Sequence, residues 1–252
     1  MKIRFLGSGD GKPCSVKRRL VKEFRRPDCI LIDDRVLINP RDEALSFSDE
    51  FGFSSLFSGV DSIVFTRSSL DGLSEKTLIK LSGGRNIDIY APKDFFGDLA
   101  LPQNFSKEVF QKFVGFRAAH IDITPLVASC DGEFGFSLAL FSDRAVLYQP
   151  CGAWFAKSSY ALIKGIRFDA AIVDCAMADA PLSAGHFSHN GIESASALRS
   201  ILLSEGILGE RSRFILTSLP TDKKRPDMHE ELAAMAAEHG MTASYDGYFI
   251  TL

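Results

Sequence analysis

The stretch Ser62–Leu73, SIVFTRSSLDGL, decides how this sequence is interpreted. Its apolar residues Ile63–Phe65 predict a short buried strand, and a polar turn and a helical pattern follow. This order of elements often presents metal ligands or a nucleophile at the end of a sheet. The turn contains Arg67, Ser69 and Asp71, and only the aspartate is a good metal ligand. The stretch is therefore either an active site or the remains of one.

The composition limits the class of protein. The chain has 252 residues, of which 46% are hydrophobic and 24% charged, as in a globular protein with an ample core. A net charge of −3 gives no overall basic field that would recruit nucleic acid or an anionic membrane. No apolar run approaches the roughly 20 residues that span a bilayer. The start, MKIRFLGSGDG, does not resemble a signal peptide. We expect a cytoplasmic protein with no membrane contact.

The five cysteines are scattered and form no CxxC pair; they are Cys14, Cys29, Cys130, Cys151 and Cys175. Reduced, buried thiols are the expected state in a cytoplasmic protein, and a structural zinc site is not indicated. A soft metal site built from three of these cysteines with His186 is a less favoured alternative.

Short apolar runs alternate with helical patterns along the chain. Strands are predicted at residues 2–6, 29–32, 35–38, 63–65, 87–90, 121–125, 134–141, 145–148, 170–173, 213–217, 242–245 and 248–251. Helices are predicted at residues 73–81, 106–113, 158–164, 191–203 and 226–239. Asp33-Asp34 and Asp246-Gly247 indicate hairpin turns. The pattern predicts one α/β domain over residues 1–252, with two sheets between helical layers.

Four segments, in this order, resemble the metallo-β-lactamase fold superfamily. They are MKIRFLGSGDGKP at 1–13, CILIDDRVLINPRD at 29–42, IVFTRSSLDGL at 63–73, and FILTSLP with SYDGYFI at 214–220 and 244–250. The opening is similar to that of ribonuclease Z and of the phosphoribosyl cyclic phosphodiesterase group, and the closing segment resembles the latter. The resemblance covers nearly the whole chain and implies a four-layer αββα sandwich.

Members of this superfamily hydrolyse phosphodiesters, thioesters or lactams with one or two zinc, manganese or iron ions. Imidazoles and carboxylates on these ions lower the pKa of a bridging water. By resemblance, the HxHxDH signature falls on Arg67, Ser69, Asp71 and Gly72. The later ligands fall near Ser129 or Cys130, on Cys151 and on Ser218. Because only Asp71 matches, the resemblance implies a degenerate site with no metal; the alternative is one zinc or manganese ion.

One region retains residues of the kind that the resemblance requires. Asp174 ends the predicted strand 170–173, and His186 and His189 precede the predicted helix 191–203. In the related phosphodiesterases a histidine at this place protonates or orients the phosphate. The resemblance does not decide which of the two histidines corresponds.

Each candidate also has a structural interpretation. Asp71 could be a lone ligand, a base or the N-cap of the helix 73–81, and the cap is favoured. Arg67 could bind an anion or form a salt bridge with Asp71. His186 and His189 could line a ligand pocket or pack at a helix start. The turn GSGDG at 7–11 is favoured as a tight turn over a phosphate cradle.

The stretch Lys12–Arg26 is strongly basic. It could grip a phosphate-containing ligand or RNA, or form a solvated loop, and the loop is favoured. No aromatic stacking pattern accompanies the charges, so nucleic acid is only weakly supported as a partner.

Our leading hypothesis is a catalytically degenerate protein that binds a small anionic ligand or a protein partner without metal-dependent hydrolysis. The expected cleft contains Arg67, Ser69, Asp71, Cys151, Asp174, His186, His189 and Ser218. The alternative is a weak phosphodiester hydrolase with one metal held by Asp71 and by Asp174 or His186. A third hypothesis is a subunit that docks on a partner through its surface.

Overall fold

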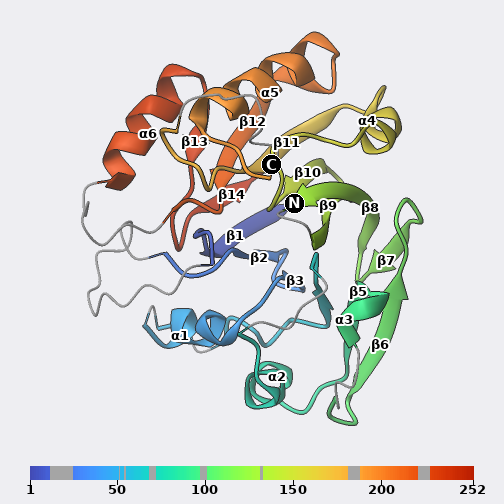
Figure 1. Ribbon diagram of the computed structural model, residues 1–252. Helices are drawn as coiled ribbons and strands as arrows, with labels where there is room; N and C mark the ends of the chain where they lie inside the picture. Colours follow the sequence, from blue (N-terminus) through green and yellow to red (C-terminus); the bar gives the residue numbers. More distant parts are fainter. Residues whose placement is uncertain are drawn as a thin grey trace.

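Two seven-stranded sheets pack face to face in the computed structural model (Figure 1). The structure describes residues 1–11, 25–50, 52–53, 55–67, 72–96, 101–130, 133–180, 188–220 and 228–252.

The first sheet has the order β14-β1-β2-β3-β4-β5-β6. Its strands are β1 (Lys2–Gly7), β2 (Cys29–Ile32), β3 (Val36–Ile38), β4 (Ser62–Val64), β5 (Ile87–Pro92), β6 (Phe105–Phe110) and β14 (Phe249–Thr251). Strands β3 to β6 are parallel, and β14, β1, β2 and β3 pair antiparallel. The predicted hairpin between β2 and β3 is confirmed, since Asp33 and Asp34 both take positive φ, 48° and 57°, at its turn.

The second sheet has the order β13-β12-β11-β10-β9-β8-β7. Its strands are β7 (Phe116–Ala118), β8 (Ile121–Cys130), β9 (Glu133–Phe141), β10 (Ala145–Gln149), β11 (Phe168–Asp174), β12 (Leu208–Thr217) and β13 (Thr242–Ala243). Strands β10 to β13 are parallel. Their carboxyl ends therefore meet at one edge, which places the residues after Gln149, Asp174 and Thr217 close to one another.

Helices cover the outer face of each sheet. They are α1 (Asp42–Glu50), α2 (Glu75–Ser82), α3 (Lys93–Phe96), α4 (Lys157–Ile163), α5 (Ile192–Ser204) and α6 (Met228–Glu238). One apolar layer lies between the sheets, a second joins the first sheet to α2 and α3, and a third joins the second sheet to α5 and α6. This arrangement confirms the predicted αββα sandwich. Within the described chain, no helix has the length and apolarity needed to cross a membrane.

Two predicted elements are wrong. Residues 106–113 were predicted as a helix, but Phe105–Phe110 forms the edge strand β6, because parallel pairing with β5 outweighs the local helical pattern. The predicted hairpin over residues 242–251 is also wrong. Thr242–Ala243 pairs with β12 in the second sheet, whereas Phe249–Thr251 pairs with β1 in the first. Asp246-Gly247 therefore lies in the connection between the two sheets.

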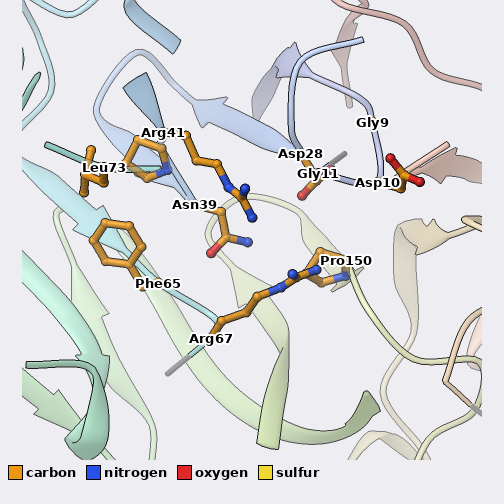
Figure 2. Close-up of a pocket in the computed structure, with 11 residues that line it drawn as sticks. Gly9, Asp10, Gly11, Asp28, Asn39, Arg41, Phe65, Arg67, Leu73 and Pro150 are labelled. Atoms are coloured by element: carbon orange, nitrogen blue, oxygen red, sulfur yellow. The ribbon is translucent and has the colours of Figure 1, made fainter. Parts of the chain in front are cut away.

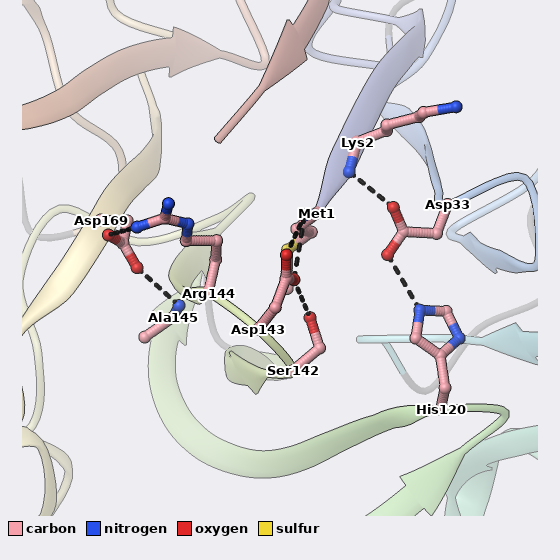
Figure 3. A network of polar contacts seen from close by, with 9 residues as sticks. All are labelled: Met1, Lys2, Asp33, His120, Ser142, Asp143, Arg144, Ala145 and Asp169. Carbon is pink, nitrogen blue, oxygen red and sulfur yellow. Dashed lines mark hydrogen bonds and ion pairs between the residues drawn. The ribbon is translucent and has the colours of Figure 1, made fainter.

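Polar contacts join the two sheets at the far end of β2 (Figure 3). Asp33 accepts a hydrogen bond of 2.6 Å from the backbone N–H of Lys2, and its other oxygen lies 2.9 Å from Nε2 of His120 before β8. The amino group of Met1 donates to Asp143 in the β9–β10 turn at 3.0 Å. Asp28 lies at the opposite end of β2, in the pocket described next.

Candidate functional site

A pocket lies where the carboxyl ends of β3 and β4 approach the glycine-rich turn after β1 and the end of β10 (Figure 2). Its lining residues are Gly9, Asp10, Gly11, Asp28, Asn39, Pro40, Arg41, Phe65, Arg67, Leu73 and Pro150. Of the predicted cleft residues, Arg67 is the one that this lining includes. Ser69, Asp71 and His186 lie outside the described residues.

Arg67 lies in a turn that is stabilised by hydrogen bonds with Asn39. The side-chain amide of Asn39 donates to Thr66 Oγ1 at 2.8 Å, and the backbone N–H of Thr66 donates to Asn39 Oδ1 at 2.9 Å. Figure 2 shows the Arg67 side chain extended across the pocket toward Pro150. Among the described residues, Arg67 forms no hydrogen bond and no ion pair. Asp71, the predicted partner of Arg67, lies outside the described chain.

Arg41 brings a second guanidinium to the pocket. It follows β3 and runs over the backbone of two glycines that take positive φ, Gly11 at 88° and Gly72 at 80°. A Cβ built on Gly11 would lie 3.4 Å from the Arg41 guanidinium, and one on Gly72 would lie 3.3 Å from Arg41 Cδ. Because neither glycine has a Cβ, the side chain of Arg41 can pass close to their backbone. Arg41 is absent from the predicted cleft.

Asp28 places a carboxylate in the same pocket, immediately before β2. Its oxygens accept hydrogen bonds from Thr217 Oγ1, at 2.5 Å, and from the hydroxyl of Tyr148. Burial raises the pKa of Asp28 to about 6, although both hydroxyls and the nearby Arg67 act in the opposite direction. The pocket thus combines two permanent cations, Arg41 and Arg67, with two carboxylates, Asp10 and Asp28, of which Asp28 has a pKa raised to about 6.

Asp174 and His189 are brought together at the end of β11. His189 Nδ1 lies 3.1 Å from one oxygen of the fully buried Asp174, whose other oxygen accepts the backbone N–H of Asn190 at 2.9 Å. Burial raises the pKa of Asp174, and the hydrogen bond from His189 partly offsets this effect. The pair holds the chain at the start of α5, so His189 packs at a helix start, next to Asp174.

Two further candidates are engaged in structural contacts. Ser218, at a φ of 53°, is buried and donates its hydroxyl to the carbonyl oxygen of Pro150 at 2.8 Å. Cys151 is buried and disulfide-bonded, so the expectation of reduced cysteines is wrong at this position. Cys29 and Cys175 are buried free thiols, as expected.

Potential metal-ligating side chains are not clustered in the part of the chain that the structure describes. Among these residues, no group of three His, Cys, Asp or Glu side chains is placed to hold a metal ion. At the positions that the resemblance assigns to ligands, Arg67 carries a cation, Cys151 has no thiolate, and Ser218 donates its proton to a carbonyl.

Two structural interpretations need correction. The N-cap of α2 is Ser74, which accepts from the backbone N–H of Thr77, so the cap predicted for Asp71 is wrong. The end of the basic stretch is also not a solvated loop, because Arg25 and Arg26 are 3% and 2% exposed. The reason is that both arginines have buried acceptors. Arg26 donates to Asp246 at 3.0 Å and Arg25 to the carbonyl of Ser244 at 3.1 Å.

Asp246, the buried acceptor of Arg26, also holds the glycine-rich turn. It is 1% exposed and also accepts the backbone N–H and the hydroxyl of Ser8, both at 3.0 Å. The backbone of the glycine-rich turn is also held by two β-bridges, because Gly9 pairs with Pro27 on one side and with Leu219 on the other. The turn is a tight, packed structure, and its residues Gly9 to Gly11 face the pocket.

Comparison with solved structures identifies the fold. A metallo-β-lactamase fold protein, YhfI from Bacillus subtilis, superposes with a TM-score of 0.71 at 16% identity, over 99% of this chain and 98% of that one. Zinc-bound PqqB from Methylobacterium extorquens gives 0.72 at 15% identity over the full length of both chains. A diphosphatase of the PhnP family gives 0.68 at 15% identity over 100% and 97%. No family model and no curated protein matches the sequence.

The chain therefore has the metallo-β-lactamase fold, as the order of its sequence segments predicted. At 15–16% identity the likeness extends to the fold alone.

Proposed function

We propose that this protein binds a small anion in the pocket of Arg67, Arg41 and Asn39, without metal-dependent hydrolysis. The observation that carries the proposal is the position of Arg67. It follows β4 where the superfamily signature begins, and its guanidinium extends into the pocket (Figure 2). A guanidinium remains charged at all physiological pH values and matches the geometry of phosphate and carboxylate groups.

The surroundings of Arg67 support an anionic guest. Arg41 lines the same space, and Asn39 adds an amide to the wall. The lining also holds the carboxylates of Asp10 and Asp28, but a divalent cation close to Arg67 would be repelled by both guanidiniums. An anion would be attracted by both, in a pocket whose apolar residues Phe65, Leu73 and Pro150 reduce screening by water.

Calorimetric titration with inorganic phosphate and with acetate tests the proposal. We expect the wild type to bind at least one of the two, and Arg67→Gln to weaken that binding by about tenfold, as expected for the loss of a charge-assisted contact. Arg117→Gln is the matched control, because Arg117 is an exposed arginine on β7. Equal affinities in wild type and Arg67→Gln would refute the assignment.

The second candidate function is a metal-dependent hydrolase, and the fold favours it because diphosphatases share this fold. One metal would be held by Asp71 and by Asp174 or His186. This candidate predicts metal-stimulated hydrolysis of bis(p-nitrophenyl) phosphate that Asp71→Ala abolishes. Elemental analysis of the purified chain after incubation with zinc, manganese and iron distinguishes the two candidates, because only the hydrolase retains stoichiometric metal.

A further inference from the structure

Asp28 is one of two acidic residues that line the pocket, with Asp10, beside the guanidiniums of Arg41 and Arg67. Figure 2 shows it beside Gly11, while Arg41 and Arg67 line the same space. A guest bound to the guanidiniums therefore has a carboxylate as a second neighbour. The part of the guest that faces this carboxylate must therefore be able to donate a hydrogen bond.

The orientation of Asp28 is fixed by hydroxyl groups of the second sheet. Thr217 Oγ1 donates to Oδ1, and the hydroxyl of Tyr148 donates to Oδ2. Tyr148 is fully buried, so it cannot turn away from the carboxylate. A carboxylate can accept about four hydrogen bonds. Each oxygen of Asp28 thus keeps acceptor capacity beyond the one bond it receives from the protein.

In the described part of the chain, no lysine, arginine or histidine forms an ion pair with Asp28. Arg67 is near enough to favour the ionised carboxylate by its charge, but it does not contact it. A partly buried carboxylate held only by hydroxyls is unfavourable unless a further donor compensates its lost hydration. The side of Asp28 that faces the pocket is where such a donor would bind.

We infer that the ligand is a small anion that also carries a hydroxyl group, and that this hydroxyl donates to Asp28 while the anionic group contacts Arg67. The inference rests on the proposed function and extends it to the class of ligand. A hydroxyl is favoured over an ammonium group because Arg67, which is near enough to act on Asp28 by its charge, would repel a cation bound to the same carboxylate.

Matched pairs of ligands test this inference. Lactate and propionate carry the same anionic group with and without a hydroxyl, and so do glycerol 3-phosphate and propyl phosphate. For at least one pair, we expect the hydroxylated member to bind the wild type about tenfold more tightly. In Asp28→Asn that preference should fall to less than about threefold, with the circular dichroism spectrum unchanged.

The outcomes separate this inference from the proposed function. If the members of each pair bind equally to the wild type and Arg67→Gln weakens both, the anion site stands and the role of Asp28 is overturned. If neither member of either pair binds, the anion site itself fails. Because the first comparison uses wild-type protein only, it remains decisive even if Asp28→Asn does not fold.

Discussion

Tyr148 on β10 donates its hydroxyl to Asp28, which precedes β2 and lines the candidate pocket, and this hydrogen bond connects the two sheets. Thr217, at the end of β12, makes a second connection of the same kind at 2.5 Å. The carboxylate of the pocket is thus positioned by the packing of one sheet on the other. Changes in this contact should affect stability and ligand binding together.

Replacing Tyr148 by phenylalanine removes one of the two hydroxyls on Asp28 and keeps the ring. Because a buried carboxylate then lacks a donor, we expect a loss of about 1–3 kcal/mol in the free energy of unfolding. Urea denaturation at pH 7 measures it. Tyr160→Phe on α4, at the periphery of the second sheet, is the control and should change stability by less than about 0.5 kcal/mol. A loss of the same size in both variants would contradict the role given to Tyr148.

The pKa of Asp28 predicts a pH dependence of stability. Burial raises this pKa from the ordinary value of 3.8 to about 6, so the folded chain retains the proton over a range where the unfolded chain releases it. The contribution of Asp28 is therefore fully present below about pH 4 and is lost as the pH rises through about 6. Asp28→Asn should gain about 2 kcal/mol relative to wild type between pH 4 and 7.

Denaturation of both proteins at several pH values gives the difference directly. Burial also raises the pKa of Asp246 to about 6, so Asp246 changes stability with pH in the same direction. Because it is present in both proteins, its effect cancels in the difference between them. A difference between wild type and Asp28→Asn that does not change with pH would show that Asp28 is not the titrating group.

The buried ion pair of Asp246 and Arg26 should be a stronger determinant of stability than the surface pairs. Asp246→Ala leaves Arg26 and the backbone N–H of Ser8 without their buried acceptor, and we expect a loss of about 3–5 kcal/mol. Asp122→Ala removes an exposed pair with Arg117 and should have an effect below about 1 kcal/mol. Thermal denaturation of both variants measures the contrast. Similar shifts in the two variants would argue against this account of the turn.

Much of the fold could be predicted from the sequence, because most strands carry their own apolar pattern and the segments follow the order of a known fold. The failures have local causes. Residues 106–113 were predicted as a helix because the exposed middle of the edge strand Phe105–Phe110, Ser106 to Val109, has the polarity of a helix surface. Asp246-Gly247 has the composition of a hairpin turn. Contacts of Asp246 with Ser8 and Arg26, distant in sequence, direct the chain into the other sheet instead.

The candidate site was predicted only in part. The resemblance located the turn of Arg67 because that turn occupies the place of a known signature. Asp28 and Arg41 were not predicted, since the signature does not include them and single charged residues beside strands are common. Their convergence depends on how the strands are ordered in the sheets, which no local pattern reveals. The sequence offered two signals. Asp28 directly precedes a segment of the resemblance, and Arg41 lies within that segment.

The central claim is that the pocket binds an anion without a metal. Its most direct test is calorimetric titration of inorganic phosphate into chelator-treated protein, repeated after addition of zinc or manganese. Our account predicts binding to the metal-free protein with an affinity that the metals leave unchanged. Binding that appears only after a metal is added would contradict it.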